Sequence, residues 1–78
     1  MSCKFFAPVF DATANKHPEI EFERLQLDDP ANAEIVRKFD VTTIPRVVML
    51  DDKGEPLYNG SPLGTESGFE MQLDRYRQ

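Results

Sequence analysis

The sequence has only one cysteine and one histidine among its 78 residues, which excludes several common means of stabilising a small fold. A single cysteine cannot form an internal disulfide, and one histidine beside one cysteine makes a poor metal site. A chain of this length also leaves a large share of its surface in water, so it is marginally stable without such help. We therefore expect one small, partial domain over residues 1–78, with no metal and no cofactor.

Basic residues and long apolar runs are also scarce. The 9 Lys and Arg residues are scattered and are outnumbered by 14 Asp and Glu residues, which gives a net charge of -5. Nucleic acid is not expected as a partner, because phosphates require a concentrated basic surface. The longest apolar run, residues 44–50, is broken by Pro45 and Arg46, and the chain opens without a basic-then-apolar signal segment. We expect no membrane span and a cytoplasmic location.

Apolar spacing and turn residues predict six elements in the order helix, strand, helix, strand, strand, helix. The predicted helices cover residues 3–15, 30–39 and 66–77. The predicted strands cover residues 20–27, 46–50 and 56–59. The first of these strands has apolar side chains on both faces, which suits the middle of a sheet covered by helices on both sides. The pattern indicates the α/β class, with helices on both faces of a mixed sheet.

Local signals fix several ends of these elements. Asp29 and Thr65 are suited to cap the second and third helices, and Gly54 supplies a positive φ angle to the hairpin turn. Helical spacing predicts buried stripes on all three helices. These stripes are Phe5, Phe6, Val9, Phe10 and Thr13; Ala33, Ile35, Val36 and Phe39; and Phe69, Leu73 and Tyr76. Met71 lies off the last stripe, and we expect it to be exposed.

Cys3 stands at the mouth of the most apolar helix. A helix N-terminus stabilises a thiolate, because unpaired backbone N–H groups and the helix dipole face the sulfur. Pro8, five residues on, should loosen that helix, since proline removes a donor and crowds the preceding turn. The chain thus begins where a redox site would ordinarily lie.

Five pieces of sequence, in this order and at this spacing, resemble the thioredoxin family over nearly the whole chain. They are residues 3–11, similar to the family's active-site helix from its second cysteine onward; residues 22–28, similar to its central strand; residues 43–45, similar to its cis-proline loop; residues 52–55, similar to its last hairpin; and Gly60, the glycine after its final strand. The resemblance implies a thioredoxin-like three-layer sandwich that lacks the N-terminal strand, helix and strand.

This resemblance implies a role for each candidate site residue. Cys3 matches the second, resolving cysteine of the Cys-x-x-Cys motif, whose first cysteine would directly precede Met1. Ile44, Pro45 and Gly60 match the family's substrate-docking edge. The residues by themselves also allow Pro45 to be an ordinary turn proline and Cys3 to be a vestige with ordinary thiol chemistry.

Three functions are compatible with these observations. The first is a thioredoxin-family thiol–disulfide oxidoreductase domain of cell redox homeostasis, with dithiol turnover lost because only Cys3 is present. The second is a non-enzymatic module that binds extended peptides or its own copy, and the third is a fragment without a function of its own. We expect protein disulfides or extended peptides as substrates, and a homodimer or partner chain that covers the missing strand.

Two further polar residues are interpreted as structural. His17 lies in a helix-ending Lys-His-Pro segment and is expected at the surface, because it has no companion cluster that would make it a ligand or base. Arg24 matches a position where the family often has a lysine that tunes the thiols. No acidic partner is evident for it in the sequence, so we expect a solvated side chain.

Overall fold

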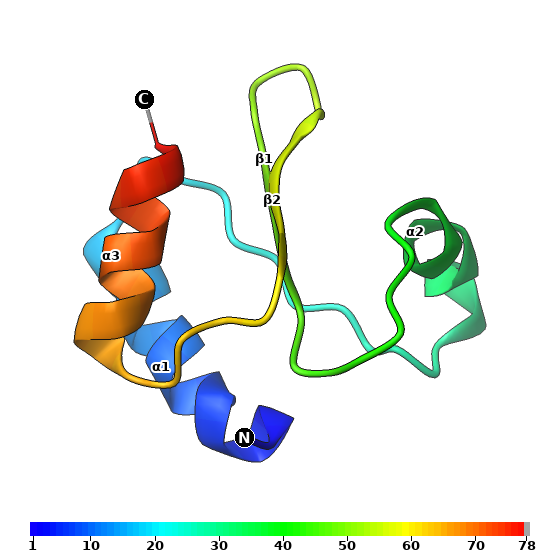
Figure 1. Cartoon of the computed structure of the whole chain (residues 1–78), viewed down its shortest axis with the longest axis horizontal. Coiled ribbons are helices and arrows are strands. Elements are labelled where there is room, and N and C mark those ends of the chain that lie inside the picture. Colours follow the sequence, from blue (N-terminus) through cyan, green and yellow to red (C-terminus); the bar gives the residue numbers. More distant parts are fainter. Residues whose placement is uncertain (78) are drawn as a thin grey trace.

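The computed structural model describes residues 1–77 and contains three α-helices, a short 3-10 helix and one antiparallel hairpin. The elements are α1 (Cys3–Lys16), η1 (Pro30–Asn32), α2 (Ala33–Lys38), β1 (Val47–Leu50), β2 (Pro56–Gly60) and α3 (Glu66–Tyr76). Figure 1 shows α1 and α3 on one side of the hairpin and α2 on the other. The α/β class and this order of layers agree with the prediction of a partial thioredoxin-like fold.

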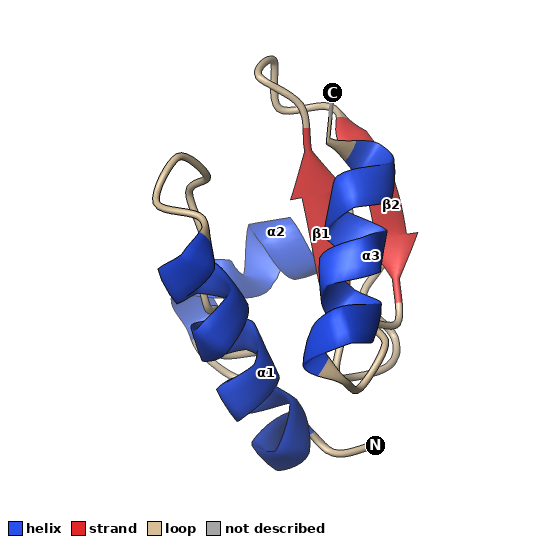
Figure 2. Cartoon of the chain, turned by 90° about the vertical axis from the view of Figure 1, so that its left-hand side faces the viewer, coloured by secondary structure: helices blue, strands red, loops and turns tan. Residues whose placement is uncertain are grey.

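The core lies between α1 and α3, which run side by side in Figures 1 and 2. Phe6, Phe69 and Leu73 are its buried apolar side chains, and the rings of Phe6 and Phe69 meet edge to face with their centroids 5.0 Å apart. Thr13 is also buried, and its hydroxyl donates a hydrogen bond of 2.9 Å to the carbonyl of Val9 in the preceding turn. The apolar contact between α1 and α3 stabilises the helix pair by removing apolar surface from water.

The stripe predicted on α1 is wrong at Phe5, whose side chain is 78% exposed. Phe6, Phe10 and Thr13 recur at helical spacing and face α3, whereas Phe5 lies about 100° round the helix from Phe6. Among residues 1–77 no second element covers that other face. Periodicity located an apolar surface correctly, but it could not tell which part of that surface has a neighbour.

The hairpin of β1 and β2 forms as predicted. Val47 pairs with Gly60 and Met49 with Tyr58, and a bulge separates Met49 from Leu50. In the turn, the side chain of Asp51 accepts hydrogen bonds from the backbone N–H groups of residues 53 and 55, at 2.8 and 2.9 Å. Gly54 has φ +80, a conformation that costs glycine little.

The strand predicted over residues 20–27 does not form. Residues 21–26 cross between α1 and α2 as an extended segment, and within residues 1–77 the only sheet consists of β1 and β2. Leu25 and Leu27, predicted to share one face of a central strand, are 46% and 45% exposed. The segment's apolar side chains on both faces suit a central strand, but a strand also needs a neighbour that satisfies its N–H and C=O groups. The observed order is therefore helix, helix, strand, strand, helix.

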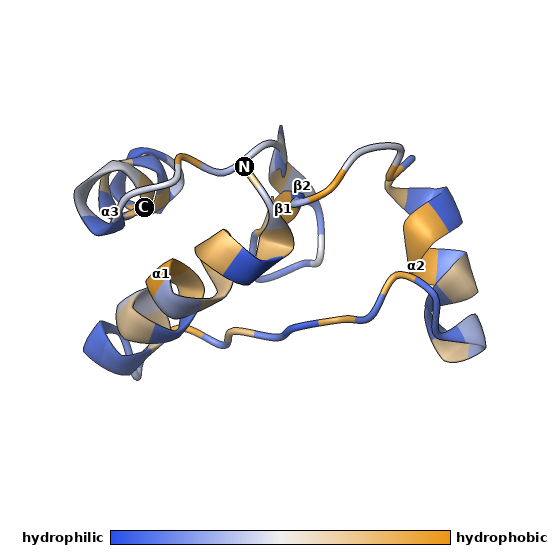
Figure 3. Cartoon of the chain, turned by 90° about the horizontal axis from the view of Figure 1, so that it is seen from below, coloured by the Kyte–Doolittle hydropathy of each residue, from blue (hydrophilic) through white to orange (hydrophobic). Residues whose placement is uncertain are grey.

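The second helix forms, but its predicted apolar stripe is not buried. The side chain of Asp29 accepts a hydrogen bond from the N–H of Ala31 at 3.0 Å, so the predicted cap is confirmed. The chain then continues through η1 into α2, where no residue is buried and Ile35 is 41% exposed. Figure 3 shows α2 standing apart from α1 and α3, with apolar positions along it. Helical spacing predicted this helix but not what packs on it.

Candidate functional site

Cys3 is the first residue of α1, and it is exposed and free. Ser2 caps the helix: its hydroxyl oxygen accepts from the N–H of Phe5 at 3.4 Å, and its carbonyl accepts from the N–H of Phe6 at 3.1 Å. Pro8 lies within α1, and the helix continues past it to Lys16. The sulfur is therefore held at a helix N-terminus where an incoming disulfide can reach it.

The predicted docking residues lie where the loop from α2 enters the hairpin. The peptide bond between Ile44 and Pro45 is cis, and the Ile44 side chain is 55% exposed. Gly60 ends β2 and pairs with Val47, so it lies at the same end of the hairpin as Pro45. A side chain at Gly60 would come within 2.8 Å of the Tyr58 hydroxyl, which itself donates to the carbonyl of residue 61. Gly60 thus has a packing role as well as its predicted place at the site.

The N-terminus lies at the same end of the molecule as the loop with Ile44 and Pro45 and as Gly60. Figures 1 and 2 show it below the open end of the hairpin, next to the loop that leads to α3. The Met1 sulfur lies against Gly64 in this loop: a Cβ atom at that position would be 2.8 Å from the sulfur. Among residues 1–77 no hydrogen bond links Cys3 to Ile44 or Pro45. The fold brings the predicted residues to one end without direct polar contact between them.

Arg24 has an acidic partner that its sequence neighbours did not reveal. Its guanidinium lies 3.6 Å from the Asp11 carboxylate, and both side chains are more than half exposed. An ion pair in such contact with water contributes little to stability. The pair connects the extended residues 21–26 with α1, and it lies away from the helix end that carries Cys3.

His17 belongs to a polar cluster that the sequence did not predict. Its side chain is only 15% exposed, with Nδ1 3.0 Å from Glu19 and Nε2 2.5 Å from Glu70. Arg77 reaches both Glu19 and the Nδ1 atom of His17. The pKa of His17 is raised by its hydrogen bonds to Glu19 and then Glu70, and the pKa of Glu19 is lowered by its own backbone N–H and then by His17. Glu70 and Arg77 lie 53 and 60 positions from His17 in the sequence, so no local pattern could have located the cluster.

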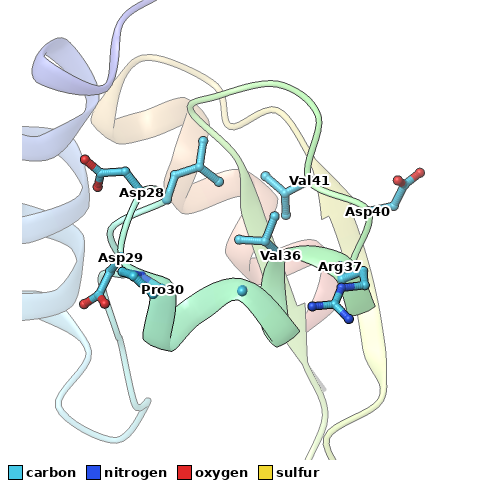
Figure 4. A pocket seen from close by; sticks show the side chains of 9 residues that line it. Asp28, Asp29, Pro30, Val36, Arg37, Asp40 and Val41 are labelled. Atoms are coloured by element: carbon cyan, nitrogen blue, oxygen red, sulfur yellow. The ribbon is translucent and has the colours of Figure 1, made fainter.

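An open pocket between α2 and its flanking loops contains none of the predicted site residues. Figure 4 shows Val36 and Val41 pointing toward its interior, while the carboxylates of Asp28, Asp29 and Asp40 point away from it. The described part of the chain, residues 1–77, contains no group of three or more side chains arranged to hold a metal ion. In the same residues no helix is long and apolar enough to cross a membrane.

Comparison with known proteins gives consistent matches. The sequence model of the Thioredoxin family matches residues 1–67. A thioredoxin H-type protein of Brassica campestris is 36% identical over 76 residues, and that of Brassica oleracea is 29% identical over the same length. Each alignment covers 97% of this chain but 58% of the relative, and no solved structure matches. The chain spans somewhat more than half of these relatives, and it belongs to the thioredoxin family.

Proposed function

We propose that the chain is a thioredoxin-family thiol–disulfide oxidoreductase domain whose one reactive group is Cys3, in the place of the resolving cysteine. The observation that supports this most is an exposed cysteine at the first turn of α1, in a chain that matches the family from that helix onward. Ile44, Pro45 and Gly60 would form the edge on which an extended substrate rests. A cytoplasmic location and a single partial domain remain our expectations from the sequence.

The chemistry available to one thiol is exchange without release. The Cys3 thiolate attacks one sulfur of a substrate disulfide, a new disulfide joins Cys3 to that sulfur, and the other sulfur leaves as a thiolate. Release of the reduced substrate needs a second thiol that attacks the mixed disulfide. Because Cys3 is the only cysteine, that thiol must come from another molecule. Dithiol turnover by this chain alone is therefore expected to be absent.

An insulin-reduction assay tests the proposal. With dithiothreitol as the electron source, the chain should not accelerate insulin precipitation beyond the rate of its Cys3→Ser variant. A longer chain should accelerate it, if the added upstream segment supplies a strand and places a cysteine directly before Met1 to complete a Cys-Met-Ser-Cys motif. Acceleration by the 78-residue chain would contradict the loss of turnover. Inactivity of the extended chain would favour the non-enzymatic alternative.

A second candidate function, self-association, rests on uncovered strand and helix surfaces. β1 pairs only with β2 in the described residues, so its other edge keeps free N–H and C=O groups. The extended residues 21–26 have no strand partner, and Phe5 faces water at 78% exposure. Free strand edges favour pairing with another chain, and exposed apolar patches mark interfaces. We infer that a second copy covers the free edge of β1 and the Phe5 face of α1.

Sedimentation velocity at micromolar concentration checks this inference. The chain should sediment as a dimer, and Phe5→Glu should shift it to the monomer by placing a charge in the buried contact. The matched control is Met71→Glu, because Met71 is also highly exposed, at 65%, but lies on α3. This variant should remain dimeric. A folded wild-type monomer would rule out the homodimer.

A further inference from the structure

The cluster around His17 connects the C-terminal end of the Cys3 helix to α3. His17 caps α1 through a backbone N–H that donates to the carbonyl of Ala14. Its ring then lies between Glu19, just beyond α1, and Glu70 on α3. Beside it, Lys16 and Glu66 form a mostly exposed ion pair of 3.4 Å. These contacts join the same two helices that form the apolar core.

The geometry allows two hydrogen-bond patterns, which differ in one proton. When both ring nitrogens of His17 are protonated, Nδ1 donates to Glu19 and Nε2 donates to Glu70. When the ring is neutral, Nε2–H can still donate to Glu70, while bare Nδ1 can accept from Arg77, whose Nη1 lies 3.0 Å away. Arg77 also donates to Glu19 in both patterns. Loss of the proton thus exchanges the partner of Nδ1 and leaves the cluster with one more negative than positive group.

We propose that His17 is a proton-controlled clasp that fixes the helix carrying Cys3 to α3, tight when the ring is charged and looser when it is neutral. The charged ring neutralises Glu70 across the helix interface and Glu19 beside it. The neutral ring leaves two carboxylates facing one guanidinium, with Lys16 engaged by Glu66. The clasp depends on no redox step, so it holds whether or not Cys3 is reactive.

The direction of the pH dependence follows from the partners of His17. Two carboxylates stabilise the charged ring, so its pKa lies above the ordinary value of 6.5. A group with a raised folded pKa contributes full stability below its unfolded pKa and loses that contribution as pH rises through the folded value. Glu19 has a lowered pKa, so its contribution is lost in acid and does not affect the neutral range. The melting temperature should therefore fall as pH rises through the near-neutral range above 6.5.

Thermal unfolding of the full chain between pH 6 and pH 8.5 tests the clasp. The wild-type melting temperature should fall across this range, and His17→Gln, which keeps a neutral donor toward Glu70, should lose that fall. Cys3→Ser should keep it, because the clasp does not involve the thiol. Loss of the pH dependence in Cys3→Ser, or its persistence in His17→Gln, would overturn the proposal.

Nuclear magnetic resonance of the one histidine gives a second readout that does not depend on the His17 variant folding. The ring protons of the wild-type chain should titrate with a midpoint above 6.5, and Glu70→Gln should move that midpoint down. The ¹⁵N shifts at high pH should report the Nε2–H tautomer, since Nδ1 then accepts from Arg77. An Nδ1–H tautomer, or a midpoint unmoved by Glu70→Gln, would contradict the proposed exchange.

Discussion

Replacement of Phe69 by alanine should lower the free energy of unfolding by about 3–5 kcal/mol. Phe69 is 1% exposed, and its ring contacts Phe6 edge to face at 5.0 Å and stacks near Phe10 at 6.4 Å. A folded chain is stabilised by roughly 0.05–0.15 kcal/mol per residue, so the loss would remove much of the stability available to 78 residues. Urea unfolding followed by far-ultraviolet circular dichroism measures this loss.

Met71→Ala is the matched control for that experiment. Met71 lies two residues further along α3 and is 65% exposed. Methionine and alanine are both good helix formers, so the change should alter the free energy of unfolding by only about 0.5 kcal/mol or less. Equal losses in the two variants would mean that α3 is not held by its inner face.

The sequence predicted best those features that depend on neighbouring residues. The Thr65 hydroxyl accepts from the N–H of Gly68 at 3.0 Å and caps α3, as expected from a threonine before an apolar run. Asp29 and Gly54 likewise occupy the cap and the turn that their residue types favour. Caps and turns are determined by a few neighbouring residues, so the local sequence is enough to predict them.

Features that depend on distant neighbours were predicted less well. Residues 20–27 have apolar side chains on both faces, as a central strand does, but no second strand lies beside them in the described chain. Phe5 and Ile35 have helical spacing, but burial depends on what covers each face. The cluster of His17 with Glu70 and Arg77 joins residues that are far apart in the sequence. Taken one at a time, these residues have the appearance of ordinary surface groups. The family resemblance predicted Cys3 and Pro45 as site residues but could not supply these contacts.

The second large effect concerns the thiol itself. Incubated with glutathione disulfide, the chain should gain the mass of one glutathionyl group, because the Cys3 thiolate attacks one sulfur and expels the other as glutathione. The mixed disulfide should then persist, since this is the only cysteine and no internal thiol can attack it. Intact-protein mass spectrometry over time measures both the gain and its persistence.

Cys3→Ser should abolish the adduct completely, and added dithiothreitol should reverse it in the wild-type chain. His17→Gln is a suitable second comparison, because His17 lies at the opposite end of α1 from the sulfur. This variant should still form the adduct, which separates the chemistry of the thiol from the docking of its helix. Spontaneous release of the adduct at low chain concentration would contradict the role of an isolated resolving thiol. Release that accelerates with chain concentration would instead mean that the Cys3 thiol of a second copy supplies the missing attack.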